Sequence, residues 1–171
     1  MKRLTLVLLI AFVSLGTYAQ TFDVSRLRAG AGFVYASDIN NIGITFNGVY
    51  NFNDAWEGAL SITHIFPKNY VNFTILDFDA HYIFYKANEE LNFYGIGGIA
   101  LTFSKWDGYQ YYDGFGNRIN IASTNHSDIG LNVGAGMNYK LTDFLNLAPE
   151  VRLTISDGSY ARIGATVQYM F

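Results

Sequence analysis

The sequence has no cysteine, and only two of its 171 residues are proline. The absence of cysteine excludes a disulfide framework and the attachment of a lipid through an N-terminal thiol. Charged residues are also scarce, at 15% of the chain, against about 25% in ordinary soluble domains. The net charge of −3 leaves no basic footprint, so we expect no nucleic-acid partner.

Long apolar runs are absent after residue 20, and the run near the N-terminus is short. Residues 1–20 read MKRLTLVLLIAFVSLGTYAQ, with two basic residues, an apolar run from Leu4 to Leu15, and a small residue at Ala19. The run falls short of the ~20 residues that span a bilayer, and the three parts are typical of a secretory signal. We therefore expect a signal peptide at 1–19 and a mature domain at 20–171.

Aromatic residues are plentiful, at 17% of the chain, and apolar residues alternate with small or polar ones. This period of two predicts β-strands. Eight segments carry it, separated by turns rich in Asn, Asp and Gly: 27–36, 42–50, 56–63, 76–84, 93–103, 129–140, 147–155 and 161–171. Residues 106–126 form one long loop, and the reversed alternation between Val71 and Ile75 indicates a bulge or a loop-like extension.

The two faces of these strands decide between two kinds of eight-stranded barrel. A soluble ligand-binding barrel turns its apolar face inward, but the large aromatic set here would overfill so narrow an interior. The opposite face carries mainly Gly, Ala, Ser, Thr and Asn, which fit a narrow lumen, whereas the rings fit lipid. The sequence therefore predicts an all-β fold, an eight-stranded antiparallel up-and-down transmembrane β-barrel.

Charged residues on the inferred inner face are balanced, with four of each sign and one histidine. A charge that faces lipid at mid-depth costs roughly 2–4 kcal/mol for Arg or Lys, whereas paired charges can remain ionised inside the barrel. A conducting pore would instead show a ring of one sign. We expect a closed polar lumen with a charge network made of Arg28, Glu57, Asp77, Asp79, His81, Lys140, Glu150, Arg152 and Arg162.

Aromatic residues also gather near both ends of the expected strands, as the girdles of membrane barrels do. One girdle contains Phe52, Trp56, Phe84, Phe93, Tyr139, Phe144, Tyr169 and Phe171, and the other contains Tyr35, Phe66, Tyr70, Phe103 and Trp106. Because the long loop follows an odd-numbered strand, it lies on the outer side if the N-terminus is periplasmic.

Three stretches resemble the small outer-membrane β-barrel family, the OmpA/OmpX-like proteins of Gram-negative bacteria: FYGIGGIALTF at 93–103, residues 129–154, and the final VQYMF. Barrels of that family end in Phe with an aromatic residue two places earlier, and Phe171 and Tyr169 match this assembly signal. The resemblance implies a place in the cell outer membrane, contact with outer-membrane lipid, and recognition by the barrel-assembly machinery. A signal peptide that is cleaved before Gln20 resembles the signal peptides of Bacteroidota.

We expect a non-enzymatic outer-membrane protein without a cofactor or a metal, which contacts an extracellular or outer-membrane protein partner through residues 106–126. A lipid-modifying enzyme of this family would place His and Ser on one face, but His126 and Ser127 alternate. His81 fits the interior network, and His64 fits the membrane interface. Other readings remain open: a narrow transporter of small apolar molecules that opens near Pro149, a subunit of a larger complex, and a soluble carrier.

Overall fold

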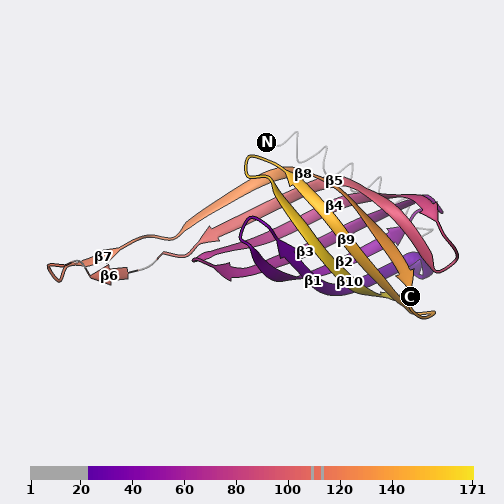
Figure 1. Ribbon diagram of the computed structural model, residues 1–171, viewed down its shortest axis with the longest axis horizontal. Helices are drawn as coiled ribbons and strands as arrows, with labels where there is room; N and C mark the ends of the chain where they lie inside the picture. Colours follow the sequence, from indigo (N-terminus) through magenta and orange to yellow (C-terminus); the bar gives the residue numbers. More distant parts are fainter. Residues whose placement is uncertain (1–22, 109, 113) are drawn as a thin grey trace, which may run out of the picture.

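Eight strands close into an antiparallel barrel in the order β1-β10-β9-β8-β5-β4-β3-β2 (Figure 1). The computed structural model describes residues 23–108, 110–112 and 114–171, so the expected signal peptide at 1–19 lies outside the described residues. The barrel strands are β1 Leu27–Ala36, β2 Asn41–Asn51, β3 Trp56–Lys68, β4 Val71–Lys86, β5 Leu91–Trp106, β8 Thr124–Lys140, β9 Leu145–Ile155 and β10 Tyr160–Met170. The predicted eight-stranded antiparallel barrel is confirmed. Among the described residues, no helix is long and apolar enough to cross a membrane.

Short turns join the strands at the end of the barrel that also holds the last residues of the chain, which we call the terminal end. The side chain of Asn53 accepts hydrogen bonds from the backbone N–H groups of Ala55 and Trp56, at 2.9 and 3.0 Å. Asn88 and Thr142 bind the backbone of the other two turns in the same way. Asn and Thr favour turns because their side chains can replace a backbone acceptor.

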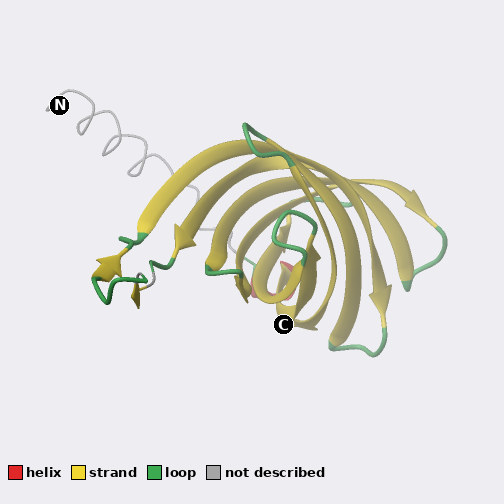
Figure 2. Ribbon diagram, turned by 60° about the vertical axis from the view of Figure 1, so that its left-hand side comes forward, coloured by secondary structure: helices red, strands yellow, loops and turns green. Residues whose placement is uncertain are grey.

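The opposite end, which we call the hairpin end, carries a short sheet of its own, made by β6 Gln110–Tyr112 and β7 Arg118–Asn120. The connection between β5 and β8 therefore spans 107–123 and contains a β-hairpin, whereas the sequence predicted one long loop over 106–126. Strands β4, β5 and β8, of 16, 16 and 17 residues, exceed the 10 or 11 residues of β1, β2, β9 and β10. They extend beyond the rest of the barrel (Figures 1 and 2).

We call this extension the projecting sheet and define it as residues 71–76, 101–106 and 124–130. Strand β8 pairs with β5 as far as Thr124, but its pairing with β9 begins only at Leu131. Residues 124–130 therefore have a partner strand on one side only within the described part of the barrel. Strands β3 and β4 are joined by Asn69 and Tyr70, whose positive φ angles of 52° and 65° give the left-handed backbone of a tight hairpin turn.

The two faces of the barrel are arranged as the alternation predicted. Phe33 and Ile129 point outward, with 70% and 69% of their surfaces exposed, whereas Asp77 is fully buried inside. Large apolar side chains thus cover the outer wall, and small or polar ones fill the interior.

Two details of the sequence prediction are wrong. Strand β4 alternates regularly between inward and outward residues at its start, without the bulge or loop-like extension predicted there. Its first apolar residues, Phe73 and Ile75, point inward on the same face as Asp77. They join an apolar cluster inside the hairpin end, with Val34, Ala36, Ile65, Ala100 and Tyr160. The register irregularities lie instead between Ile65 and Lys68 in β3 and between Ile83 and Tyr85 in β4. Trp106 pairs with Val71 on the inward face, so it does not belong to the outer girdle.

Candidate functional site

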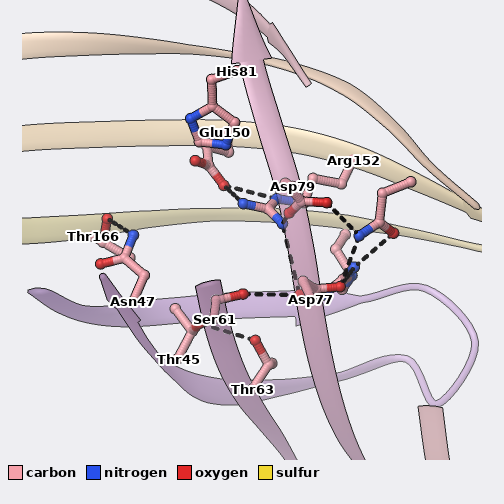
Figure 3. A network of polar contacts seen from close by, with 12 residues as sticks. Thr45, Asn47, Ser61, Thr63, Asp77, Asp79, His81, Glu150, Arg152 and Thr166 are labelled. Carbon is pink, nitrogen blue, oxygen red and sulfur yellow. Dashed lines mark hydrogen bonds and ion pairs between the residues drawn. The ribbon is translucent and has the colours of Figure 1, made fainter. Parts of the chain in front are cut away.

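The centre of the barrel holds a network of ion pairs. The guanidinium of Arg162 donates two hydrogen bonds to Asp77, from Nη1 to Oδ2 at 2.7 Å and from Nη2 to Oδ1 at 2.8 Å. Arg152 pairs with Asp79, and its Nη2 lies 2.6 Å from Oε2 of Glu150 (Figure 3). Such charge-assisted pairs are strong when the planar guanidinium matches the carboxylate. These pairs therefore hold the three strands β4, β9 and β10 together across the interior.

Uncharged side chains complete this network, and sequence reasoning missed them. The amide of Asn132 donates to Oδ1 of Asp77 at 2.8 Å and to Oδ1 of Asp79 at 2.9 Å. The hydroxyl of Ser61 donates to Asp77 at 2.9 Å, and that of Tyr94 donates to Glu150 at 2.8 Å. Their inward alternation could have identified them, because a buried charge needs such partners to satisfy its remaining lone pairs.

A second charged cluster lies nearer the terminal end. Nη2 of Arg28 is 2.8 Å from Oε2 of Glu57, and Nδ1 of His81 is 3.5 Å from the same oxygen. The His81 ring stacks on Tyr94 with 4.5 Å between ring centroids and 11° between planes. Because Tyr94 also binds Glu150, this ring connects the two charged clusters.

Lys140 does not join either cluster, which corrects the sequence prediction. It is the last residue of β8, and its Nζ lies 2.9 Å from Oδ1 of Asp143 in the following turn. The Lys140 ammonium holds the pKa of the Asp143 carboxyl below its usual range. The long side chain reaches out of the barrel end toward water. Among the residues that the structure describes, the two clusters therefore contain three arginines, four carboxylates and His81.

The free space around the network is small. A hollow of about 30 Å³ lies among Thr45, Ser61, Asp77, Arg152 and Arg162, which is room for one or two water molecules. A larger hollow of about 270 Å³ opens at the terminal end beside Arg26, Arg28 and Lys86. The interior therefore narrows from the terminal end toward the central ion pairs.

No protein-family model and no curated protein matches this chain, but solved structures do. The N-terminal β-barrel domain of OprF from Pseudomonas aeruginosa has a TM-score of 0.64 at 17% identity, over 85% of this chain and 98% of that domain. Neisserial surface protein A has a TM-score of 0.60 at 17% identity, over 85% and 96%. Ail, the attachment invasion locus protein of Yersinia pestis, has 0.58 at 17%, over 85% and 96%.

The chain has the fold of the small outer-membrane barrels. The OmpA/OmpX-like resemblance predicted from the sequence is thereby confirmed at the level of the fold. An aromatic outer wall of this kind is the face that membrane barrels turn to lipid, and the ion pairs lie in the interior.

The two residues predicted as an assembly signal lie at the terminal end of this barrel. Tyr169 and Phe171 are half exposed on its outer wall, with their ring centroids 5.1 Å apart. The backbone N–H of Phe171 donates to the carbonyl of Leu27 at 3.3 Å. The last residue therefore extends the seam at which β10 closes the barrel against β1.

The histidines occupy three different surroundings in this barrel. Nδ1 of His64 lies 3.1 Å from the Thr74 hydroxyl on the outer wall, and His81 lies in the lumen. His126 is paired across the strands with Ser104 on the inward face, a pairing that sequence reasoning missed because 22 residues separate them. The Ser104 hydroxyl donates to the His126 carbonyl at 3.4 Å, so it binds backbone.

Within the described residues, no group of three or more His, Cys, Asp or Glu side chains is placed to hold a metal ion.

The pairing of β8 with β9 is interrupted between Gly136–Glu150 and Tyr139–Leu147. Pro149 lies in this interval, and it lacks the N–H group that a ladder hydrogen bond needs.

Proposed function

We propose that this protein is an integral outer-membrane barrel with a closed polar lumen, which exposes its hairpin end on the cell surface to contact a partner. Its role is structural and interactive and involves no catalysis. The partner would contact the hairpin β6–β7, which lies within the segment 106–126.

The proposed orientation rests on the lengths of the connections. Periplasmic turns of outer-membrane barrels are short and extracellular connections are longer. The three turns at the terminal end have four residues each, 52–55, 87–90 and 141–144. At the hairpin end, the connections 37–40, 69–70 and 156–159 are no longer than these, so the orientation depends on the one long connection, 107–123. On this basis we propose that the terminal end faces the periplasm and the hairpin end faces the exterior.

The closed lumen is supported by the Arg162–Asp77 pair. Asp77 is fully buried and Arg162 nearly so. Separating them would leave an unpaired buried charge, at a cost of about 3–5 kcal/mol. On the exterior side, the apolar cluster around Phe73 and Tyr160 fills the barrel interior. A solute that passed through the lumen would have to displace both the central ion pair and this apolar cluster.

The observation that carries the proposed interaction is the edge of β8. Residues 124–130 pair with β5 on one side, and the described part of β9 does not reach the other. An uncovered edge is a template for an added strand, and a partner that supplies an extended segment binds there through main-chain hydrogen bonds. The hairpin β6–β7 lies beyond the end of this edge (Figure 1).

The natural absence of cysteine allows a direct test of this orientation. We expect Phe115→Cys, in the exposed hairpin, to react with a membrane-impermeant maleimide on intact cells. The matched variant Glu89→Cys, in a terminal-end turn, should react only after the outer membrane is permeabilised. Labelling of Glu89→Cys on intact cells would overturn the orientation.

The interaction is tested by affinity purification in mild detergent. A co-purified partner should be recovered with the intact chain and lost from a variant without residues 110–120. Equal recovery of that partner with both proteins would overturn a role for the hairpin.

A narrow transporter of small apolar molecules is the second candidate, favoured by the interrupted β8–β9 pairing at Pro149. Such a transporter would need an opening between these strands. Replacing Pro149 with Val would restore a ladder donor and should abolish uptake of an apolar solute into proteoliposomes. If wild type and the Pro149→Val protein take up the solute no faster than empty liposomes, this candidate is excluded.

A further inference from the structure

The outward face of the projecting sheet contains a hollow of about 440 Å³, within the range of small-ligand sites. It is lined by residues of three adjacent strands: Asn72 and Thr74 of β4, Phe103, Ser104 and Lys105 of β5, and Asn125, His126 and Ser127 of β8. Two cross-strand rows form it, Asn72–Lys105–Asn125 and Thr74–Phe103–Ser127. Their side chains share the face that is in contact with lipid nearer the barrel centre.

The hollow lies where that outer face changes from apolar to polar. The next row toward the terminal end, Leu76–Leu101–Ile129, is entirely apolar. The polar row begins one or two outward positions later on each strand. A membrane barrel makes this change where hydrocarbon gives way to lipid headgroups. The hollow is therefore continuous with the lipid-contacting wall and lies at headgroup depth.

The groups around the hollow are mostly neutral. The amides of Asn72 and Asn125 and the hydroxyl of Ser127 can both donate and accept hydrogen bonds. The Thr74 hydroxyl can do so as well, and one of its hydrogen bonds is shared with Nδ1 of His64 at 3.1 Å. Phe103, with 44% of its surface exposed, adds a flat apolar ring face. The one ammonium, that of Lys105, already pairs with Asp107 at 2.6 Å.

The composition of this lining distinguishes a sugar headgroup from a phosphate headgroup. A phosphate would be bound by several unpaired cations or by a bidentate arginine. The described lining offers one lysine, which is paired, and one histidine, His126, which belongs to the inward-facing positions of β8. A sugar ring has hydroxyls that donate and accept, and a C–H face that packs on an aromatic ring. The neutral amides, hydroxyls and Phe103 match the sugar.

We propose that this hollow binds a sugar of a glycolipid headgroup in the outer leaflet, next to the lipid-facing wall. This inference rests on the proposed orientation, which places the projecting sheet in that leaflet. The glycolipid would anchor the side of the sheet that faces the membrane and leave the β8 edge open to a partner.

Native mass spectrometry of the full-length mature protein in detergent micelles tests the site. Rough-type lipopolysaccharide, which carries core sugars, is the glycolipid probe, and phosphatidylglycerol is the phosphate-bearing probe without a sugar. We expect lipopolysaccharide to bind at least ten-fold more tightly than phosphatidylglycerol. Equal binding of the two probes, or no binding of lipopolysaccharide, would overturn the proposal.

Three variants locate the site, and heat modifiability on a gel verifies that each is folded. Asn72→Ala combined with Asn125→Ala should weaken lipopolysaccharide binding at least ten-fold, whereas the control Asn120→Ala, in the exposed strand β7, should leave it unchanged. Lys105→Gln should change it less than three-fold, and a larger loss would indicate phosphate recognition and contradict the sugar assignment. Because these measurements need no cell surface, their failure is distinguishable from failure of the orientation, which maleimide labelling reports.

Discussion

At the scale of single residues, the lumen depends on charges that satisfy one another. Asp77 accepts hydrogen bonds from Arg162, Asn132 and Ser61, and Arg152 lies 3.6 Å away. Removing one partner leaves the others buried with unbalanced charge, whereas removing both members of a pair does not. The network is therefore expected to be strongly non-additive.

We expect Arg162→Met to lower the free energy of unfolding by about 3–5 kcal/mol, because it leaves the Asp77 carboxylate without its main partner. Urea unfolding in lipid vesicles measures this loss. The double variant with Asp77→Asn should lose about 1–3 kcal/mol less than the sum of the two single variants. The exposed Arg118→Met serves as the control and should change stability by less than about 0.5 kcal/mol. Additive single effects would show that the two residues do not interact.

A glycine next to Tyr94 provides a second test at this scale. A Cβ on Gly136 would lie 2.6 Å from the Tyr94 ring, which is held by His81 and Glu150. Gly136→Ala should therefore cost about 1–3 kcal/mol through overpacking, measured by the same urea unfolding.

The matched control for that variant is Gly97→Ala. This glycine lies on β5, and a Cβ there would have no atom within 4 Å. Its effect should stay within about 0.5 kcal/mol. If both variants unfold at the same urea concentration, Gly136 is not packed against the Tyr94 ring as closely as in the structure.

At the scale of strands, alternation decides which ring meets lipid. Trp56 lies on the outer wall with its ring 4.9 Å from Tyr82, whereas Trp106 pairs with Val71 on the inward face. The two tryptophans are therefore expected to differ in contact with acyl chains although both lie near strand ends.

Brominated lipids measure this difference by quenching tryptophan fluorescence. In the Trp106→Phe variant, the remaining Trp56 should be strongly quenched. In the Trp56→Phe variant, the remaining Trp106 should be quenched at least two-fold less. The reverse order would mean that the outward and inward faces of β3 or β5 are exchanged.

At the scale of the whole molecule, the barrel and the hairpin are separable. Strands β6 and β7 pair only with each other in the described sheets, and the barrel closes without them. The seam between β1 and β10 instead reaches the last residues of the chain, where Phe171 donates to Leu27.

Two deletions should therefore have opposite results. Loss of residues 110–120 should leave heat modifiability and insertion into the outer membrane intact. Loss of residues 169–171 should reduce the folded form at least ten-fold, because it removes both the predicted assembly signal and part of the closing strand. Normal assembly without residues 169–171 would refute the role predicted for Tyr169 and Phe171.

The sequence alone predicts the eight strands, their order along the chain and the orientation of most residues. Local alternation fixes these features, because successive side chains of a strand must point to opposite faces. For the same reason, it places Arg28, Glu57, Asp77 and Arg152 on the inner face, where all four are buried.

Which inward residues contact one another depends on how the strands are arranged in space. Arg162 and Asp77 are 85 positions apart, and their pairing depends on the stagger of strands around the closed barrel. Alternation also does not specify how far along the barrel axis a residue lies. That position places Lys140 beside Asp143 at the barrel end and Phe73 in an apolar cluster. The unequal lengths of β8 and β9, which leave the β8 edge uncovered, likewise follow from register.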